Sequence, residues 1–285
     1  MVEQDIVVED RAATRKGARA LPSGRWAKNA WRLSVLPLLA FFLIPIVVIF
    51  TRTTPSRILA SLSDPQVYQG LAVSLKTTLI SLGLILVLGT PLAYLIGRFK
   101  FKLKNLVETL VDLPTVLPPS VAGLALLLAF GRTGPIGSVL SHWGVTLAFT
   151  PAAVVMAQIF IASPYYIRSA SIGFGSIEDE YMQAAELDGA GPWQLFRYII
   201  LPMARYALLS GGVMSWARAL GEFGATIMFA GNFLGRTQTM PLAIYLGFES
   251  NLEAALTLSV ILVGISCCSL ILIRIITSRM SSKLE

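Results

Sequence analysis

A set of polar residues recurs at helical spacing inside an otherwise apolar stretch near the C-terminal end. The set consists of Ser215, Arg218, Glu222 and Thr226. Steps of three and four residues place these side chains on one face of a helix. A charge at the centre of a bilayer costs about 2.5–3.5 kcal/mol, so such residues normally face a protein interior or an aqueous cavity. We expect Arg218 and Glu222 to be paired and turned away from lipid, either as an internal ion pair that fixes packing or as the lining or gate of an anion path.

A second pattern lies upstream, in a long polar connection over residues 168–203. It reads Gln183-Ala-Ala-Glu-Leu-Asp-Gly189 and is followed, after nine residues, by Ile199-Ile-Leu-Pro202. The small side chains of Ala184 and Ala185 would let another protein approach the helix backbone closely, and glycine permits a sharp turn at the helix end. An ordinary amphipathic helix at the membrane surface is the alternative interpretation.

The same connection carries signals for two short helices. Ser176 and Asp179 have the spacing of a capping box, which predicts a helix from Ile177 to Asp188. Gly189 and Gly191 would end it, and Pro192 suits the first position of a second helix. We therefore expect a helix, a glycine turn and another helix.

Residue patterns that would support catalysis, redox chemistry or metal binding are absent from the sequence. No G-x-x-x-x-G-K-[ST] motif is present to hold nucleotide phosphates, and no base, nucleophile and orienting group form a set. Cys267 and Cys268 are adjacent, which disfavours a disulfide between them, and His142 falls in a short loop. The chain is not predicted to be an enzyme, and energy for any active process must come from a separate chain.

Composition and hydropathy indicate an all-α polytopic membrane protein. Hydrophobic residues make up 55% of the chain and charged residues 14%. Six apolar blocks approach or exceed the ~20 residues that a helix needs to cross a bilayer, and their lack of alternation excludes barrel strands. We expect a transmembrane domain over 33–277 between tails 1–32 and 278–285. The predicted spans are Leu33–Phe50, Ala72–Ile96, Thr115–Phe130, Leu147–Ile167, Ala204–Ala230 and Ala254–Ile276.

The net charge of +7 is distributed unevenly between the loops. Seventeen Lys and Arg residues lie in the two tails and in the 2–3 and 4–5 connections, against four in the other loops. By the positive-inside tendency, both termini and these two connections are predicted to be cytoplasmic, in a plasma membrane. The basic excess is thus explained by topology and not by a nucleic-acid partner. An uncleaved first span is preferred over a secretory signal, because no small-x-small cleavage site follows Phe50.

Two spans have features that affect packing. Gly89, Ala93 and Gly97 form a strip of small residues in the second span, which favours close helix contact. The third span begins with three prolines, Pro114, Pro118 and Pro119, which remove backbone donors and should bend or interrupt the helix. A kinked helix start and a flexible element beside a transport path both fit this pattern.

The pattern from residue 183 to residue 202 resembles the EAA signature of permease subunits of ABC importers. In that family it marks a short coupling helix that docks on a separate ATPase. The resemblance assigns ATPase coupling to Gln183, Ala184, Ala185, Asp188, Gly189, Ile199, Leu201 and Pro202. The family's leading Glu is here Gln183, so a salt bridge to the ATPase at that position is not expected.

Longer strings are similar to the molybdate permease subfamily. They include Ala217–Thr226, Gly235–Tyr245 and Asp112–Gly123. The resemblance implies two permease subunits, as a homodimer, with two ATPase subunits and an external oxyanion-binding protein. It implies no cofactor on this chain, since ATP and Mg²⁺ would bind the ATPase. Tungstate and sulfate permeases share part of the pattern. An ATPase-independent secondary transporter or channel also stays open, although Glu222 is the only acidic residue well inside a predicted span.

Overall fold

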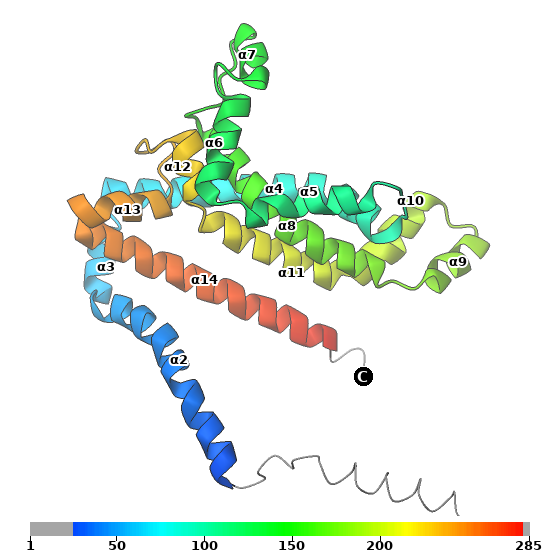
Figure 1. Cartoon of the computed structure of the whole chain (residues 1–285), viewed down its shortest axis with the longest axis horizontal. Coiled ribbons are helices and arrows are strands. Elements are labelled where there is room, and N and C mark those ends of the chain that lie inside the picture. The colour runs from blue at the N-terminus through cyan, green and yellow to red at the C-terminus, as the bar shows by residue number, and fades with distance from the viewer. Residues whose placement is uncertain (1–24, 282–285) are drawn as a thin grey trace, which may run out of the picture. The chain divides into compact units, whose positions relative to one another are not determined.

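The computed structural model describes the backbone of residues 25–281, and this part of the chain is helical with short connections (Figure 1). It divides into two units at Thr51. The first unit contributes α2 (Arg25–Thr51), an apolar helix with Pro37 and Pro45 inside it. The expected N-terminal tail therefore falls partly in α2 and partly, over residues 1–24, outside the described residues.

The second unit holds the remaining helices, which run from residue 55 to residue 281. In chain order they are α3 (Pro55–Ser61), α4 (Pro65–Arg98), α5 (Lys104–Val116), α6 (Pro119–Phe130), α7 (Pro135–His142), α8 (Pro151–Gly175), α9 (Asp179–Leu187), α10 (Pro192–Leu195), the π-helical turn η2 (Phe196–Ile200), α11 (Leu201–Leu220), α12 (Gly224–Ala230), α13 (Met240–Ser250) and α14 (Leu252–Ser281). Many begin at a proline, whose fixed φ suits the first helical position and whose missing N–H would be unpaired there.

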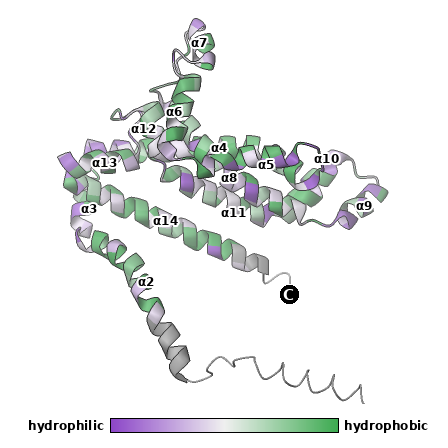
Figure 2. Ribbon diagram, viewed as in Figure 1, coloured by the Kyte–Doolittle hydropathy of each residue, from purple (hydrophilic) through white to green (hydrophobic). Residues whose placement is uncertain are grey.

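Within the described residues, three helices are long and apolar enough to cross a membrane. They are Ser34–Thr51 of α2, the whole of α4, and Leu252–Ile276 of α14. Figure 2 shows these helices as largely hydrophobic. The pair α5 and α6, bent by 115°, would make a fourth if it is one span. The protein is thus an all-helical polytopic membrane protein. The predicted fourth and fifth spans correspond to α8 and α11, which carry charged residues such as Arg168 and Arg218.

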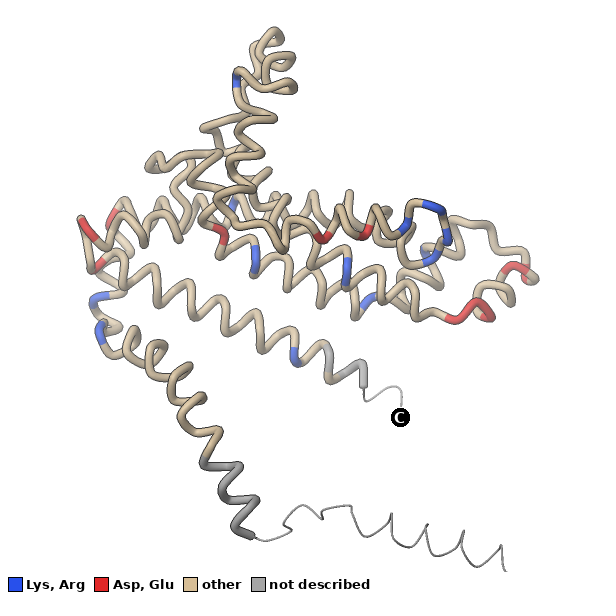
Figure 3. The backbone as a smooth tube through the Cα atoms, in the orientation of Figure 1, with Lys and Arg blue, Asp and Glu red and all other residues tan. Residues whose placement is uncertain are grey.

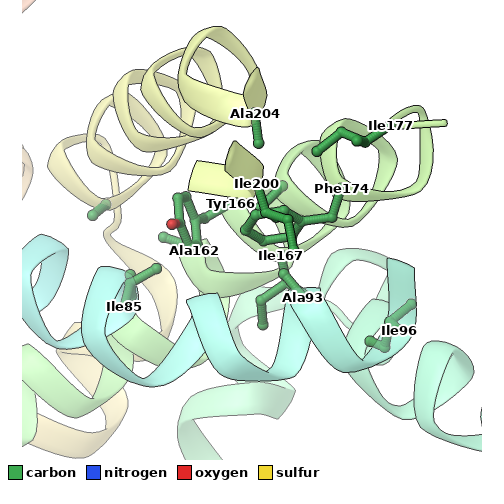
Figure 4. Close-up of a cluster of buried hydrophobic side chains, with 12 residues drawn as sticks. Ile85, Ala93, Ile96, Ala162, Tyr166, Ile167, Phe174, Ile177, Ile200 and Ala204 are labelled. Atoms are coloured by element: carbon green, nitrogen blue, oxygen red, sulfur yellow. The ribbon is translucent and has the colours of Figure 1, made fainter. Parts of the chain in front are cut away.

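Helix α8 lies at the centre of the second unit, where it packs against both α4 and α11. The predicted strip of small residues lies at the α4–α8 contact. A Cβ on Gly89 would lie 3.0 Å from the ring of Tyr166, and one on Gly97 would lie 2.5 Å from the carbonyl oxygen of Ser171. Figure 4 shows Ala93 in the same buried cluster as Tyr166. The prediction of close packing along this strip is confirmed.

Buried polar side chains join α4 to α8 and α11. The Ser81 hydroxyl donates to Gln158 Oε1 at 2.8 Å, and Gln158 Nε2 donates to Thr77 Oγ1 at 3.1 Å. The indole of Trp216 on α11 donates to Thr78 at 3.1 Å. Satisfied polar groups of this kind fix the register of neighbouring helices.

Two predicted spans are interrupted. Residues 115–130 do not form one helix, because α5 ends at Val116 and α6 begins at Pro119, as the three prolines indicated. Residues 204–230 do not form one helix either: α11 ends at Leu220 and α12 begins at Gly224. The second break was not predicted. Its cause is local, because the Glu222 side chain accepts a hydrogen bond from the N–H of Ala225 and so starts a new helix.

Candidate functional site

Helix α9 carries the first part of the predicted coupling motif and contains no buried residue. Gln183 and Ala184 are exposed and Ala185 is half-buried. Large apolar side chains are exposed around them, with Leu187 at 89% and Trp193 at 71%. Figure 3 shows that acidic residues gather on this helix. The surface of α9 therefore combines exposed apolar side chains with acidic ones. Exposed apolar side chains of this size are typical of a surface that binds another protein chain.

The start of α9 differs from the predicted one. The helix begins at Asp179 instead of Ile177, and no side chain caps it. Ser176, expected to form the capping box, instead donates its hydroxyl to the carbonyl oxygen of Gly173 at 3.0 Å. The reason is that α8 continues to Gly175, so Ser176 belongs to the end of that helix.

Arg98, at the C-terminal end of α4, holds the start of α9. It donates to the carbonyl oxygen of Ile177 at 2.7 Å, forms an ion pair with the Asp179 carboxylate and contacts the sulfur of Met182 at 3.2 Å. Its side chain is only 11% exposed. This anchor was not predicted from the sequence, where its one signal is a basic residue in the last turn of a long helix.

The glycine turn after α9 has the predicted geometry. Gly189 has a φ of 86°, in the left-handed region. Its N–H binds the carbonyl oxygen of Glu186 at 3.0 Å, while the N–H of Ala190 binds that of Ala185 at 2.9 Å. This is the Schellman arrangement, so the chain reverses sharply and leaves Asp188 and Gly189 exposed.

The second part of the motif lies on a continuous helical segment and not on a separate short helix. Helix α10 passes directly into η2 and then into α11. In η2 the N–H of Leu201 binds the carbonyl oxygen of Phe196, five residues back. This wider turn precedes Pro202, whose ring would clash with the carbonyl of a regular α-turn. Ile199 and Leu201 are half-buried and Pro202 is exposed.

The polar set of the fifth predicted span is divided by the break between α11 and α12. Arg218 and Glu222 form the expected pair, with 2.9 Å between Nη1 and Oε2, and Glu222 is only 1% exposed against 30% for Arg218. Ser215 is buried and donates to the carbonyl oxygen of Ala162 at 2.8 Å. The buried Thr226 hydroxyl has no hydrogen-bond partner among the described residues.

The break between α11 and α12 lies against the break between α5 and α6. A Cβ on Gly224 would lie 2.7 Å from Cβ of Pro119, and one on Gly123 would lie 2.7 Å from the carbonyl oxygen of Ala225. We call these two segments, residues 117–123 and 221–225, the paired breaks. The two interruptions are therefore in direct contact with each other.

Pro114 and one residue of an ion pair lie close to the paired breaks in the sequence, and Pro118 lies within them. Pro114 is buried and lines a cavity of about 380 Å³ between α4, α5, α6 and α8, whereas Pro118 is exposed. Asp112 on α5 pairs with Arg168 on α8 at 2.5 Å. Within residues 25–281 no group of three His, Cys, Asp or Glu residues could hold a metal ion.

The coupling motif and the paired breaks both lie in the part of the chain that is similar to known proteins. The pattern of the family described as "Binding-protein-dependent transport system inner membrane component" matches residues 89–282, which include the coupling motif and the paired breaks.

Among curated proteins, the molybdenum transport system permease protein ModB of Mycobacterium tuberculosis is 39% identical over 228 residues, covering 80% of this chain and 86% of that protein. The probable transport system permease protein NifC of Clostridium pasteurianum is 37% identical, covering 81% of each. The sulfate transport system permease protein CysW of Escherichia coli K12 is 36% identical, covering 81% and 80%.

Solved structures share the fold at lower identity. A bacterial ABC transporter that imports the acidic polysaccharide alginate aligns with a TM-score of 0.65 and 17% identity, covering 88% of this chain and 96% of that chain. The MetNI methionine ABC transporter, in inward-facing conformations, aligns with a TM-score of 0.57 and 20% identity, covering 75% and 99%.

Proposed function

The chain belongs to the family of binding-protein-dependent transport system inner membrane components, and from this premise we propose that it forms the membrane path of an ATP-driven importer for molybdate. Family membership sets aside the ATPase-independent channel or secondary transporter. The chain is a transport component and not itself an enzyme, and it carries no cofactor of its own.

The observation that carries the proposal is helix α9, which has no buried residue and presents the motif from Gln183 to Gly189 with its spacing to Pro202 intact. We propose that a separate ATPase chain, binding ATP and Mg²⁺, docks on this surface. Exposed Leu187 and Trp193 would be buried on docking, and the small Ala184 lets the partner approach the helix closely. Arg98 would then pass a displacement of α9 to α4.

The choice of substrate is drawn from the relatives. ModB is named for molybdenum transport and CysW for sulfate transport, at 39% and 36% identity. Both ions are tetrahedral dianions, so an oxyanion is the shared inference. Molybdate is preferred because the strings at Ala217–Thr226 and Gly235–Tyr245 resemble that subfamily. Sulfate is the second candidate, with CysW as the observation that favours it, and tungstate is a third.

The family and the charge distribution support a proposal for the assembly and the orientation. We propose a homodimer of this chain, two ATPase subunits and an external binding protein. One of the related structures is described as a complex with a periplasmic protein bound to its substrate, which supports the last partner. We further propose six spans, with both termini and α9 on the cytoplasmic side of the inner membrane, because Lys and Arg concentrate there.

The paired breaks are the proposed position of the path. Arg218 is the partly exposed member of a pair whose partner, Glu222, is buried, so its guanidinium can meet an anion while staying neutralised. Pro118 and Pro119 lie at the break between α5 and α6, on the other side of the proposed path. They would allow this side to change position, because proline interrupts the helical hydrogen bonds.

Uptake by reconstituted vesicles tests the proposal. Vesicles that contain this chain, its ATPase and its binding protein should accumulate molybdate when ATP is supplied inside. Vesicles that lack the ATPase should not. Uphill uptake without an ATPase would contradict the coupling role of α9. Uptake of sulfate in preference to molybdate, with the same ATP requirement, would keep the importer and correct the substrate.

A further inference from the structure

A cavity of about 460 Å³ lies between α4 and α8, away from both regions described above. Apolar side chains such as Ile80, Val155 and Ile159 form most of its wall. Two basic residues also line it: Lys76 of α4 and Arg236 of the loop between α12 and α13.

Neither cation is neutralised in the described part of the chain. The side chains of Lys76 and Arg236 are exposed, form no ion pair and make no hydrogen bond there. No Asp or Glu lines the cavity. Lys76 lies four residues, roughly 6 Å, inside the predicted span Ala72–Ile96, since an α-helix rises 1.5 Å per residue. A lysine near the end of a span can extend its amine to the membrane surface, where water or an anion meets it.

The backbone beneath Lys76 is held in place by the buried polar network of α4 and α8. Thr77, the next residue, lines the same cavity and accepts a hydrogen bond from Gln158 at 3.1 Å. Its own hydroxyl donates to the carbonyl oxygen of Val73 at 2.9 Å. The network fixes how α4 sits against α8, so the position of Lys76 over the cavity is set before any ligand arrives.

Arg236 is presented by a tight turn. Gly235 has a φ of 71°, and the N–H groups of Arg236 and Thr237 both bind the carbonyl oxygen of Phe233, at 3.0 and 2.9 Å. A Cβ on Gly235 would lie 2.7 Å from the side-chain oxygen of Gln69 on α4, so the turn is in close contact with that helix. The two cations therefore come from separate segments that are packed together.

We propose that Lys76 and Arg236 form a binding site for a tetrahedral oxyanion in this cavity. Two like charges that line one cavity repel each other, and an anion bound by both relieves that repulsion. Arginine offers a fork of N–H donors to such an ion and lysine offers a compact positive charge. The oxyanion can be a free ion, as the proposed transport function supplies, or the phosphate of a phospholipid whose acyl chain occupies the apolar part.

Equilibrium binding to the full-length chain in lipid nanodiscs tests the site without any ATPase. One arm uses discs of a phosphate-free lipid, digalactosyldiacylglycerol, and measures binding of radiolabelled molybdate and sulfate. The other uses discs containing phosphatidylglycerol and measures, by mass spectrometry, the anionic lipid retained on the chain after detergent exchange. The variants are Lys76→Gln, Arg236→Gln and the double substitution. Arg57→Gln, which removes an exposed cation that does not line this cavity, is the control.

Each single substitution should weaken binding about tenfold or more, because a hydrogen bond to a charged group is lost. Arg57→Gln should leave binding unchanged. Loss in the first arm assigns the site to a free oxyanion, and loss in the second alone assigns it to a phospholipid. Equal binding by the wild type and the double variant in both arms, or no binding by the wild type in either, would overturn the proposal. Because uptake is not measured, this outcome is distinct from failure of the transport function.

Discussion

The surface of α9 and the paired breaks differ in what holds their residues in place. No residue of α9 is buried. Arg98 holds its start, the half-buried Met182 packs against the core, and the Gly189 turn ends it. At the paired breaks, Gly123 and Gly224 bring backbone against backbone, and Glu222 is almost fully buried. Substitutions on α9 should therefore affect partner binding, whereas substitutions at the breaks should affect the fold as well.

The largest effect is expected from breaking the ion pair of Arg218 and Glu222. Arg218→Met leaves a buried carboxylate without its cation, which should cost about 3 kcal/mol, the lower end of the range for buried pairs because Arg218 is partly exposed. Glu222→Gln should cost less, since its oxygen can still accept from the N–H of Ala225. Thermal unfolding and the yield of assembled complex measure both.

The double variant Arg218→Met with Glu222→Gln separates the two roles that the sequence left open. A structural pair predicts that assembly and oxyanion uptake per complex both recover. An arginine that meets the anion predicts recovered assembly without recovered uptake. Wild-type assembly and uptake in all three variants would show that the polar set contributes neither packing nor transport.

A smaller loss is expected from filling the contact between the breaks. Gly123→Ala would place a methyl group within 2.7 Å of the Ala225 carbonyl oxygen, and overpacking of this kind costs about 1–3 kcal/mol. Gly83→Ala on α4 is the matched control, because nothing lies within 4 Å of its added Cβ. The midpoint of thermal unfolding should fall for the first variant and hold or rise for the second. Equal midpoints would show that the breaks are not tightly packed.

A substitution in the glycine turn should weaken ATPase association without unfolding the subunit. Gly189→Ala forces a side chain into a left-handed conformation at a cost of about 1–2 kcal/mol, although space is open around it. ATPase association, measured by co-purification and titration, should weaken about five- to thirtyfold while the subunit remains folded. Gly191→Ala, at a φ of −75°, is the control and should associate normally. Similar association by both variants would rule out a role for the turn geometry.

The smallest effect is expected from Gln183→Glu, which restores the charge that the family carries. Gln183 is exposed, so stability should change by less than about 0.5 kcal/mol. ATPase association should become more dependent on ionic strength, because a charge now lies at the docking surface. If this substitution instead destabilised the isolated subunit, α9 would be part of the fold and the contrast between the two regions would fail.

The features that the sequence predicted correctly are those with a local cause. The strip from Gly89 to Gly97, the positive φ of Gly189 and the interruption at Pro118 each follow from what glycine and proline permit. The pairing of Arg218 with Glu222 follows from helical spacing. In each case the decisive residues are within a few positions of one another.

The features that were missed depend on tertiary contacts or on competing local bonds. Arg98 and Asp179 are far apart in the sequence, and no local pattern joins them. Ser176 had two possible partners, and the extension of α8 decided between them. The break after Leu220 was hidden because the helical spacing of the polar residues continues through it, from Arg218 to Glu222 and Thr226. The hydrogen bond from the N–H of Ala225 to Glu222 is visible only in the structure.

The continuous segment from Pro192 through η2 to Leu220 has a mechanical consequence. At 1.5 Å per residue it is a rod of roughly 40 Å, so a tilt of about 5° around one end sweeps the other through about 3–4 Å. We expect this segment to bend most easily at η2, because the α-helical hydrogen bonding is interrupted there by a π-helical turn. Arg98 also connects the start of α9 to the end of α4. A displacement of the loop that contains α9 would therefore move both α4 and α11, the two helices that pack against α8, relative to α8.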